Sequence, residues 1–307
     1  MPAMGPRILS LLLAAGLSGW ASSPWAEAVE TPPASPPEAS EAGRHPGADG
    51  WRQSLAGRPE AAELVWLEGS GDRFPALYRE HETARRQGAV ILLHDMGANP
   101  AWPRVMTPLR RLLPPWGWDV LALELSVPAG EDGKESEGQK TDIARLEAAM
   151  AFLQARGAKH IALIGHGGGA DLAQSYALGS GPDRFQAVVC ISPSASLEVN
   201  DAGASLPPLL DVHGERDLPS VLKAVAMRRL AARRAGLDRP VPAPLRNAAL
   251  MRTRPSPAES MPPRYRSLRI SGADHGYAGY EAPLLRRILG WLRSQLGSRR
   301  GDGPLAL

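Results

Sequence analysis

The sequence predicts a single α/β domain built on a doubly wound, mostly parallel sheet. Short apolar runs recur along the chain, and segments with a helical spacing of apolar residues separate several of them. The runs are apolar on both faces, as expected for strands buried inside a parallel sheet. They comprise residues 89–93, 119–125, 160–164, 187–191, 209–213 and 265–270.

The remaining elements follow from shorter patterns. Two strand-like runs, 62–68 and 74–80, flank Gly69-Ser70-Gly71-Asp72, which predicts a β-hairpin ahead of the parallel strands. Helical spacing is clearest in two segments, where it places apolar residues on one face. The residues are Ile143, Leu146, Met150 and Leu153 in the first segment, and Leu285, Ile288, Leu289 and Leu292 in the second. Together these elements predict one domain over residues 60–297.

The first 28 residues have the pattern of a cleavable signal peptide. Arg7 precedes the apolar run 8–17, and Ala26-Glu27-Ala28 matches an A-x-A cleavage site. The run is too short to remain as a membrane-spanning helix, so none is expected in the mature chain. The protein is therefore expected to be periplasmic or secreted.

Three further segments are expected outside the regular elements. Residues 29–59 are rich in Pro and Ala and poor in large apolar side chains, which predicts a disordered N-terminal tether. Residues 239–264 predict an inserted surface loop rich in Pro and Arg, and residues 298–307 a flexible tail. The basic segment 228–254 is either a solvated surface or a contact for an acidic partner in the cell envelope.

Composition argues against a nucleic-acid-binding protein and against a protein stabilised by disulfides. The formal net charge of +3, from 35 basic and 32 acidic residues, disfavours a dedicated nucleic-acid-binding protein. Cys190 is the only cysteine, so no disulfide forms within the chain. It lies within the apolar run 187–191, where we expect it to be a small core residue.

The sequence after the run 160–164 has the context of a nucleophile elbow. Gly165-His166-Gly167-Gly168-Gly169-Ala170 joins a strand to a helix expected from Asp171, as G-x-S-x-G does. Gly165 and Gly169 match the outer glycines, and Gly167 occupies the serine position. The same letters match a dinucleotide loop, but the next strand, 187–191, ends in Ser192-Pro193 without the acidic residue that such a loop requires.

Three other strand ends carry the remaining signatures in the expected order. Asp217 follows the run 209–213, and His275 follows the run 265–270, which reproduces the order nucleophile, acid, histidine. His94-Asp95-Met96 follows the strand that supplies half of an oxyanion hole. The candidate catalytic groups are therefore Asp217 and His275, with Gly167 as a degenerate nucleophile position.

With these motifs the chain resembles the α/β-hydrolase superfamily. More narrowly, it resembles a family of uncharacterised, exported bacterial α/β-hydrolase-like proteins. The resemblance rests on L-L-H-D-M-G-A-N-P-A-W-P (92–103), G-H-G-G-G-A (165–170), V-H-G-E-R-D (212–217) and A-D-H-G-Y (273–277). It implies the fold and no established reaction. Two departures stand out: Asp95 replaces the usual glycine, which we expect only to disturb the oxyanion loop, and Gly167 removes the attacking hydroxyl.

Two functions from different classes follow. The first is a ligand-binding or scaffolding pseudo-hydrolase that holds a small molecule or anion at the elbow. Asp95, Met96, Gly168 and Gly169 are its candidate oxyanion or anion-binding residues, because open backbone N–H groups at a helix start favour anions; Asp171 could instead cap those groups. The second is an enzyme in which His275 and Asp217, within hydrogen-bond reach, activate water or abstract a proton without a covalent step.

Other chemistries are weaker. Four strand-end histidines, His94, His166, His213 and His275, lie near Asp95, Asp217 and Asp274 in the predicted fold. None shows metal-ligand spacing with another, so neither a metal nor another cofactor is expected. Ser192 and Ser194 are the nearest hydroxyls to the elbow, but they follow a different strand and are not expected to be nucleophiles.

Overall fold

The computed structural model describes residues 48–58, 63–69, 72–126, 137–181, 183–199, 206–239 and 263–300. All of them belong to one compact unit, His45–Leu307. The expected signal peptide (1–28) and nearly all of the expected inserted loop lie outside the described residues. Among those residues no helix is long and apolar enough to cross a membrane.

The described residues form one eight-stranded sheet in the order β1-β2-β4-β3-β5-β6-β7-β8. Its first two pairings are antiparallel and the other five are parallel, which confirms the predicted hairpin and parallel sheet. The strands are β1 Leu64–Gly69, β2 Asp72–Arg79, β3 Gly88–Leu93, β4 Trp118–Leu123, β5 Ile161–His166, β6 Ala187–Ile191, β7 Leu209–Arg216 and β8 Tyr265–Asp274.

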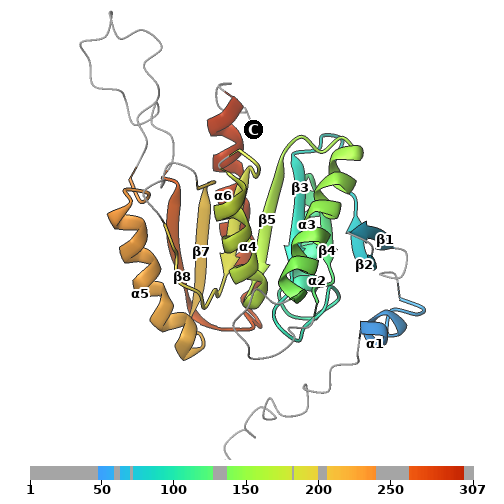
Figure 1. Ribbon diagram of the computed structural model, residues 1–307, viewed down its shortest axis with the longest axis horizontal. Coiled ribbons are helices and arrows are strands. Elements are labelled where there is room, and N and C mark those ends of the chain that lie inside the picture. The colour runs from blue at the N-terminus through green and yellow to red at the C-terminus, as the bar shows by residue number, and fades with distance from the viewer. Residues whose placement is uncertain are drawn as a thin grey trace, which may run out of the picture. The chain divides into compact units, whose positions relative to one another are not determined.

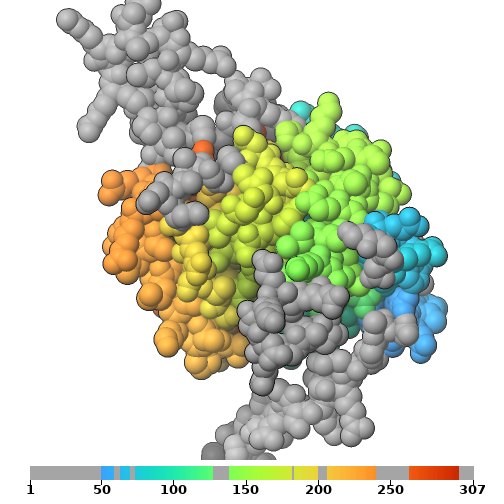
Figure 2. Space-filling model, viewed as in Figure 1, coloured from blue at the N-terminus to red at the C-terminus, as the bar shows by residue number. Residues whose placement is uncertain are grey.

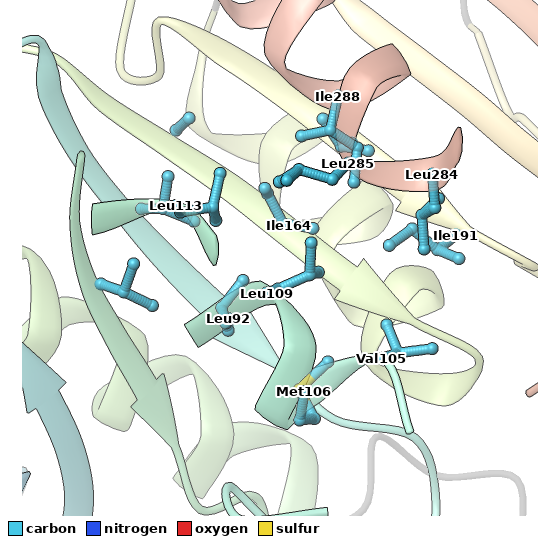
Figure 3. Close-up of a cluster of buried hydrophobic side chains, with 14 of the residues drawn as sticks. Leu92, Val105, Met106, Leu109, Leu113, Ile164, Ile191, Leu284, Leu285 and Ile288 are labelled. Carbon is cyan, nitrogen blue, oxygen red and sulfur yellow. The ribbon is translucent and has the colours of Figure 1, made fainter. Parts of the chain in front are cut away.

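Helices cover both faces of the sheet, as the doubly wound fold requires (Figure 1). They are α1 Ala48–Gln53, α2 Met106–Leu112, α3 Glu137–Ala155, α4 Gly168–Ser180, α5 Pro219–Arg234 and α6 Glu281–Arg300, with a short 3-10 helix, η2, at Pro114–Trp116. Successive strand residues point to opposite faces, so Leu92 packs in the core under α2 and α6 while Leu93 packs under α3 and α4. Figure 3 shows Leu92 and Ile164 of the sheet beside Leu109 and Ile288 of those helices.

The folded domain begins earlier than the sequence predicted. Trp51 and Leu55 are each 3% exposed and belong to the core under α2 and α6. The indole N–H of Trp51 also donates to Glu124 Oε1 at 3.1 Å. The expected boundary at residue 60 is therefore wrong, because two apolar side chains in a Pro- and Gly-rich segment suffice to dock it. At the other end α6 runs to Arg300, past the expected start of the tail at 298.

The helix α5 does not present all of its arginines to solvent. Arg228 is 0% exposed; its Nε donates to Asp211 Oδ2 at 2.9 Å, and its Nη1 donates to the carbonyl oxygen of Pro193 at 2.7 Å. Arg228 is therefore excluded from both alternatives for the segment 228–254, the solvated surface and the contact for an acidic partner. The arginines of α5 that remain exposed are Arg229, Arg233 and Arg234. Figure 2 shows α5, in orange, along one side of the visible face.

Cys190 lies in β6 and is fully buried and free, which confirms its expected place in the core. Burial raises the pKa of its thiol well above the usual value, so the thiolate is disfavoured. Cys190 therefore contributes packing to the sheet and has no reactive character.

We predict that Trp51→Ala destabilises the protein by about 3–5 kcal/mol, because it empties a buried aromatic site and removes the hydrogen bond to Glu124. Urea unfolding of the mature protein measures the change. Trp66→Ala is the matched control, because Trp66 is 41% exposed and contacts Arg52 and Arg73 through its ring face; its cost should be about 1 kcal/mol. Equal losses in the two variants would show that residues 48–58 do not dock on the core.

Candidate active site

The elbow is a sharp turn that only small residues permit. β5 ends at His166 and α4 begins at Gly168, three residues before the expected start at Asp171. Gly167 alone connects them, at φ 52° and ψ −121°, a left-handed conformation that glycine adopts most readily. A Cβ on Gly165 would lie 2.2 Å from the carbonyl oxygen of Gly169, so the strand and the helix touch here. The elbow predicted from the sequence is present.

The carboxylate of Asp95 occupies the space where a serine side chain would begin. A Cβ placed on Gly167 would lie 1.9 Å from Asp95 Oδ1 and 2.1 Å from Asp95 Cγ, far inside contact distance. The expectation that Asp95 merely disturbs the oxyanion loop is therefore wrong. The missing side chain at 167 and the extra carboxylate at 95 fill the same volume. The joint departure of these two positions from the family pattern is the sequence signal for this exchange, although each departure taken alone indicates only a loss.

Asp95 also fills the oxyanion hole. Its Oδ1 accepts hydrogen bonds from the backbone N–H groups of Gly168 and Met96, each at 2.7 Å. In hydrolases of this fold, the residue after the nucleophile and the loop after the third strand supply these two donors. The start of α4 adds the positive end of its dipole. The sequence predicted an anion site at the elbow that is open to a ligand. This prediction is wrong, because the protein's own Asp95 carboxylate occupies the site.

Two other residues expected at this anion site act elsewhere. A Cβ on Gly169 would lie 2.3 Å from the carbonyl oxygen of His94, so Gly169 allows α4 to approach the loop after β3. The Asp171 carboxylate accepts bonds from the N–H groups of Ser194 and Ala195, at 3.0 and 2.9 Å. It also accepts the hydroxyl of Ser194 at 2.7 Å. Asp171 therefore ties α4 to the loop after β6, and Ser194 is committed to that contact.

His275 lies between two carboxylates. Its Nδ1 is 2.8 Å from Asp217 Oδ1, which is the contact expected from sequence order. Its Nε2 is 2.9 Å from Asp95 Oδ2, a contact that no pattern along the chain indicates. Burial alone would lower the pKa of His275, but the bonds to Asp217 and Asp95 outweigh it and raise that pKa to about 9. The imidazole is therefore a cation at neutral pH and donates from both nitrogens.

Both carboxylates are ionised. Burial would raise the pKa of Asp95 and of Asp217, but the bond from His275 and the other donors lower each to about 2. A group whose pKa is raised on folding stabilises the fold at low pH, and a group whose pKa is lowered stabilises it at high pH. The contribution of His275 is complete below its ordinary pKa of 6.5 and is lost as pH rises through about 9. That of the carboxylates is complete above 3.8 and is lost as pH falls through about 2.

Ser192 holds Asp217 in place. Its hydroxyl donates to Asp217 Oδ2 at 2.5 Å and lies 3.0 Å from the hydroxyl of Tyr277. The N–H of Gly214 donates to the same carboxylate oxygen at 2.9 Å. Ser192 is 0% exposed and adopts a positive φ of 54°. Its hydroxyl therefore lies behind the acid and holds it in place.

Of the seven residues weighed as metal ligands, three come together: Asp95, His166 and His275 place ligand atoms within 4.8 Å of one another. Hydrogen bonds already pair His275 Nε2 with Asp95 Oδ2, and His166 Nε2 lies 2.9 Å from the carbonyl oxygen of His275. Burial lowers the pKa of His166, so a neutral ring packs against His275, with centroids 4.7 Å apart. Hydrogen bonds and ring packing therefore account for the arrangement of the three side chains.

His94 stabilises the loop that carries Asp95. Its Nε2 accepts the N–H of Leu125 at 3.0 Å, and its Nδ1 lies 2.7 Å from the carbonyl oxygen of Asp95. The ring must therefore carry its proton on Nδ1 and donate it to that carbonyl. Burial lowers the pKa of His94 to about 4, so this neutral form persists at physiological pH. His94 orients Asp95 without adding charge to the site.

A cavity of about 340 Å³ opens beside the oxyanion loop. Its wall includes apolar and acidic side chains together with the elbow backbone, and no Lys or Arg among the described residues. Six lining residues matter here: Met96, Leu125, Asp142, Gly168, Asp171 and Leu172. Burial raises the pKa of Asp142 above its ordinary value, and the opposing bonds to Ser126 do not offset this rise. A small molecule in this cavity would be neutral or cationic.

The sequence profile of a family described as "Protein of unknown function (DUF3530)" matches residues 7–142 and 129–294. The chain belongs to the DUF3530 family. No curated protein matches this DUF3530 protein by sequence. Membership of this family therefore identifies relatives of the chain but assigns no reaction to it.

Solved structures show the fold. An esterase from Pyrococcus furiosus matches at a TM-score of 0.54 and 17% identity, over 76% of this chain and 92% of the esterase. Est1E from Butyrivibrio proteoclasticus matches at 0.53 and 14%, over 76% and 99%. A protein of unknown function from Agrobacterium tumefaciens matches at 0.52 and 14%, over 77% and 97%. This DUF3530 protein therefore has the α/β-hydrolase fold.

We predict that Gly167→Ser destabilises the protein by about 1–3 kcal/mol and does not create a reactive serine, because the new side chain collides with Asp95. The double variant Asp95→Gly, Gly167→Ser should react with a serine-directed phosphonate, detected by intact mass. Gly179→Ser is the matched control, since a Cβ placed there would meet nothing within 4 Å. Phosphonate labelling of the single Gly167→Ser variant would contradict the proposed overlap with Asp95.

We predict that Asp95→Asn lowers the pKa of His275 by about 1–3 units, because one of its two anionic partners becomes neutral. Ring-nitrogen NMR across the titration measures the shift, with neutral His94 as an internal reference. Asp274→Asn is the matched control: this neighbouring carboxylate bonds to the N–H of Gly276 instead. An unchanged titration of His275 in Asp95→Asn would mean that the two side chains do not interact in solution.

Proposed function

We propose that this DUF3530 protein is an exported hydrolase that works without a serine nucleophile. The observation that carries the proposal is the position of the Asp95 carboxylate: it takes the place of serine, accepts both oxyanion-hole donors and bonds to His275. Asp217 completes the set on the other side of the imidazole. Asp95, His275 and Asp217, hereafter the acid–imidazole–acid unit, are the proposed catalytic residues.

Serine-type acyl transfer does not suit this unit. The hole that would receive a substrate carbonyl oxygen is filled by Asp95 Oδ1. The imidazole that would accept a proton from a hydroxyl already carries one at neutral pH, because its pKa is raised to about 9. Reaction with water therefore requires a state in which the charge on Asp95 is removed and His275 becomes a base.

The energetics favour a functional role for the unit. Holding three ionised side chains in a partly dry site requires desolvation that apolar residues of similar size would avoid. Strongly shifted pKa values grouped at one place are typical of reactive sites. Asp217 has a fully buried side chain, whereas the side chains of Asp95 and His275 are 26% and 22% exposed. The two groups that would meet a substrate are thus the two that remain accessible.

A second candidate function is a binding or scaffolding protein without chemistry. Gly167 favours it, because the residue that normally attacks is gone, and the acid–imidazole–acid unit satisfies its own hydrogen bonds. Its ligand would be a small neutral or cationic molecule in the cavity lined by Met96 and Asp142. An acidic envelope partner, where one binds, would meet Arg229, Arg233 and Arg234 of α5.

Export remains part of the proposal. The pattern of residues 1–28 supports a cleaved signal peptide and a periplasmic or secreted location. N-terminal sequencing of the protein recovered from the periplasmic fraction tests it, and a chain that retains Met1 in the cytoplasm would exclude it.

We predict that the mature protein is not labelled by serine-directed phosphonates. Hydrolysis found in a panel of neutral and cationic esters, lactones and alkyl halides should fall by about 10²–10⁴-fold in Asp95→Asn, His275→Gln and Asp217→Asn. His160→Gln and Asp238→Asn are matched controls, because both residues lie outside the site and contact other groups. Activity that survives in all three site variants would exclude the unit, and tight binding with no turnover in the panel would favour the second candidate.

A further inference from the structure

We infer that Asp95 is a covalent nucleophile: its Oδ2 forms an ester with a saturated carbon of the substrate, and the oxyanion hole serves that ester. The inference rests on the proposed function and adds the substrate class and the intermediate. It follows from the position of the hole relative to Asp95, from the chemistry of a carboxylate nucleophile and from the charges that line the adjacent cavity.

The hole is positioned on Asp95 itself. The N–H groups of Met96 and Gly168 each lie 2.7 Å from Asp95 Oδ1, so both donors are in use. A substrate carbonyl oxygen cannot reach them unless Asp95 leaves the space that serine would occupy. Water adding to Cγ of an Asp95 ester would instead place negative charge on Oδ1, where the donors already point. The tetrahedral species that this site can stabilise is therefore one formed on Asp95.

The chemistry of the nucleophile selects the electrophile. A carboxylate that attacks an ester carbonyl would form an acid anhydride, which is more reactive than the ester consumed and returns to it. A carboxylate that attacks a saturated carbon forms an ordinary ester and can release the leaving group as an anion. Asp95 Oδ2 is the oxygen available for this attack, because among the described residues it bonds only to His275 Nε2, whereas Oδ1 is held by two N–H groups. The substrate class is therefore an alkyl compound with an anionic leaving group.

The residues that line the adjacent cavity limit the class of substrate further. Asp142 and Asp171 line it together with Met96, Leu125 and Leu172, and no Lys or Arg lines it among the described residues. Carboxylates that line a cavity disfavour an anionic substrate. A volume of about 340 Å³ suits a small molecule. We therefore assign a neutral or cationic alkyl compound of small size.

The proposed reaction has two covalent steps. First, a lone pair of Asp95 Oδ2 bonds to the carbon, and the bond to the leaving group breaks with its electron pair on the departing anion. His275, with one of its two anionic partners now neutral, releases its proton to solvent. Second, His275 takes a proton from water, and the water oxygen adds to Cγ of Asp95, leaving negative charge on Oδ1.

Collapse of this species restores the protein. The bond between Cγ and the alkyl-bearing oxygen breaks, and that oxygen takes the proton from His275 to give an alcohol. The Asp95 carboxyl group then returns its own proton to His275, which regenerates the ion pair. The balance is one alkyl compound and one water in, and one alcohol, one anion and one proton out. Asp217 keeps its bond to His275 throughout and orients the ring.

The variant His275→Gln tests the intermediate directly, because it removes the base of the second step and leaves Asp95 in place. Incubation of the mature protein with 1-bromohexane, or with the cation (2-bromoethyl)trimethylammonium, should add one alkyl group per chain, mapped by peptide mass spectrometry to Asp95. The double variant Asp95→Asn, His275→Gln should gain none. Thiol alkylation does not interfere, since Cys190 is the only cysteine and is buried.

A measurement on the unaltered protein keeps the test independent of variant folding. One turnover in ¹⁸O-labelled water should place the label in the Asp95 carboxyl group, and the first alcohol released should carry the unlabelled oxygen of Asp95. Label in the first alcohol, with no adduct in His275→Gln, would overturn the covalent step and leave the proposed serine-independent hydrolase standing. If both probes give no bromide release and no adduct, the substrate class is overturned. Failure of the whole hydrolysis panel would instead remove the proposed function itself.

Discussion

The contacts of the Asp95 carboxylate organise the whole edge of the sheet where the strands end. One oxygen joins the loop after β3 to the start of α4, through the N–H groups of Met96 and Gly168. The other oxygen reaches His275 in the loop after β8, and through it Asp217 in the loop after β7. Charge-assisted bonds of this kind are about twice as strong as neutral ones. Four loops are therefore held in one geometry by a single carboxylate.

Gly167 and Asp95 make sense only together. The carboxylate has room because residue 167 has no Cβ, and any Cβ there would lie 1.9 Å from Asp95 Oδ1. In turn, without a serine at the elbow, two backbone donors and Nε2 of His275 would lack a partner unless another group met them. Each departure from the usual hydrolase pattern is a loss by itself. In combination they exchange a hydroxyl for a carboxylate at the same position.

The neighbouring histidines add no charge to the site. His94 and His166 are kept neutral because burial lowers their pKa values, so neither adds positive charge against His275. A separate buried group supports the acid: Arg228 binds Asp211 and the carbonyl oxygen of Pro193, in the loop that begins with Ser192. Ser192 in turn holds Asp217. Stability and site geometry are thus linked through the loop after β6, which explains why an arginine of a basic segment lies in the core.

The sequence by itself determined the sheet, the elbow and the pairing of Asp217 with His275. These depend on local apolar patterns and on the order of loops, which are readable along the chain. Only the tertiary structure decided where Asp95 points, because its partners lie 73 residues away at Gly168 and 180 residues away at His275. The docking of Trp51 and the burial of Arg228 were settled in the same way. In each case the decisive partner exists only once distant strands have been brought side by side, and no local pattern encodes the direction of a side chain toward it.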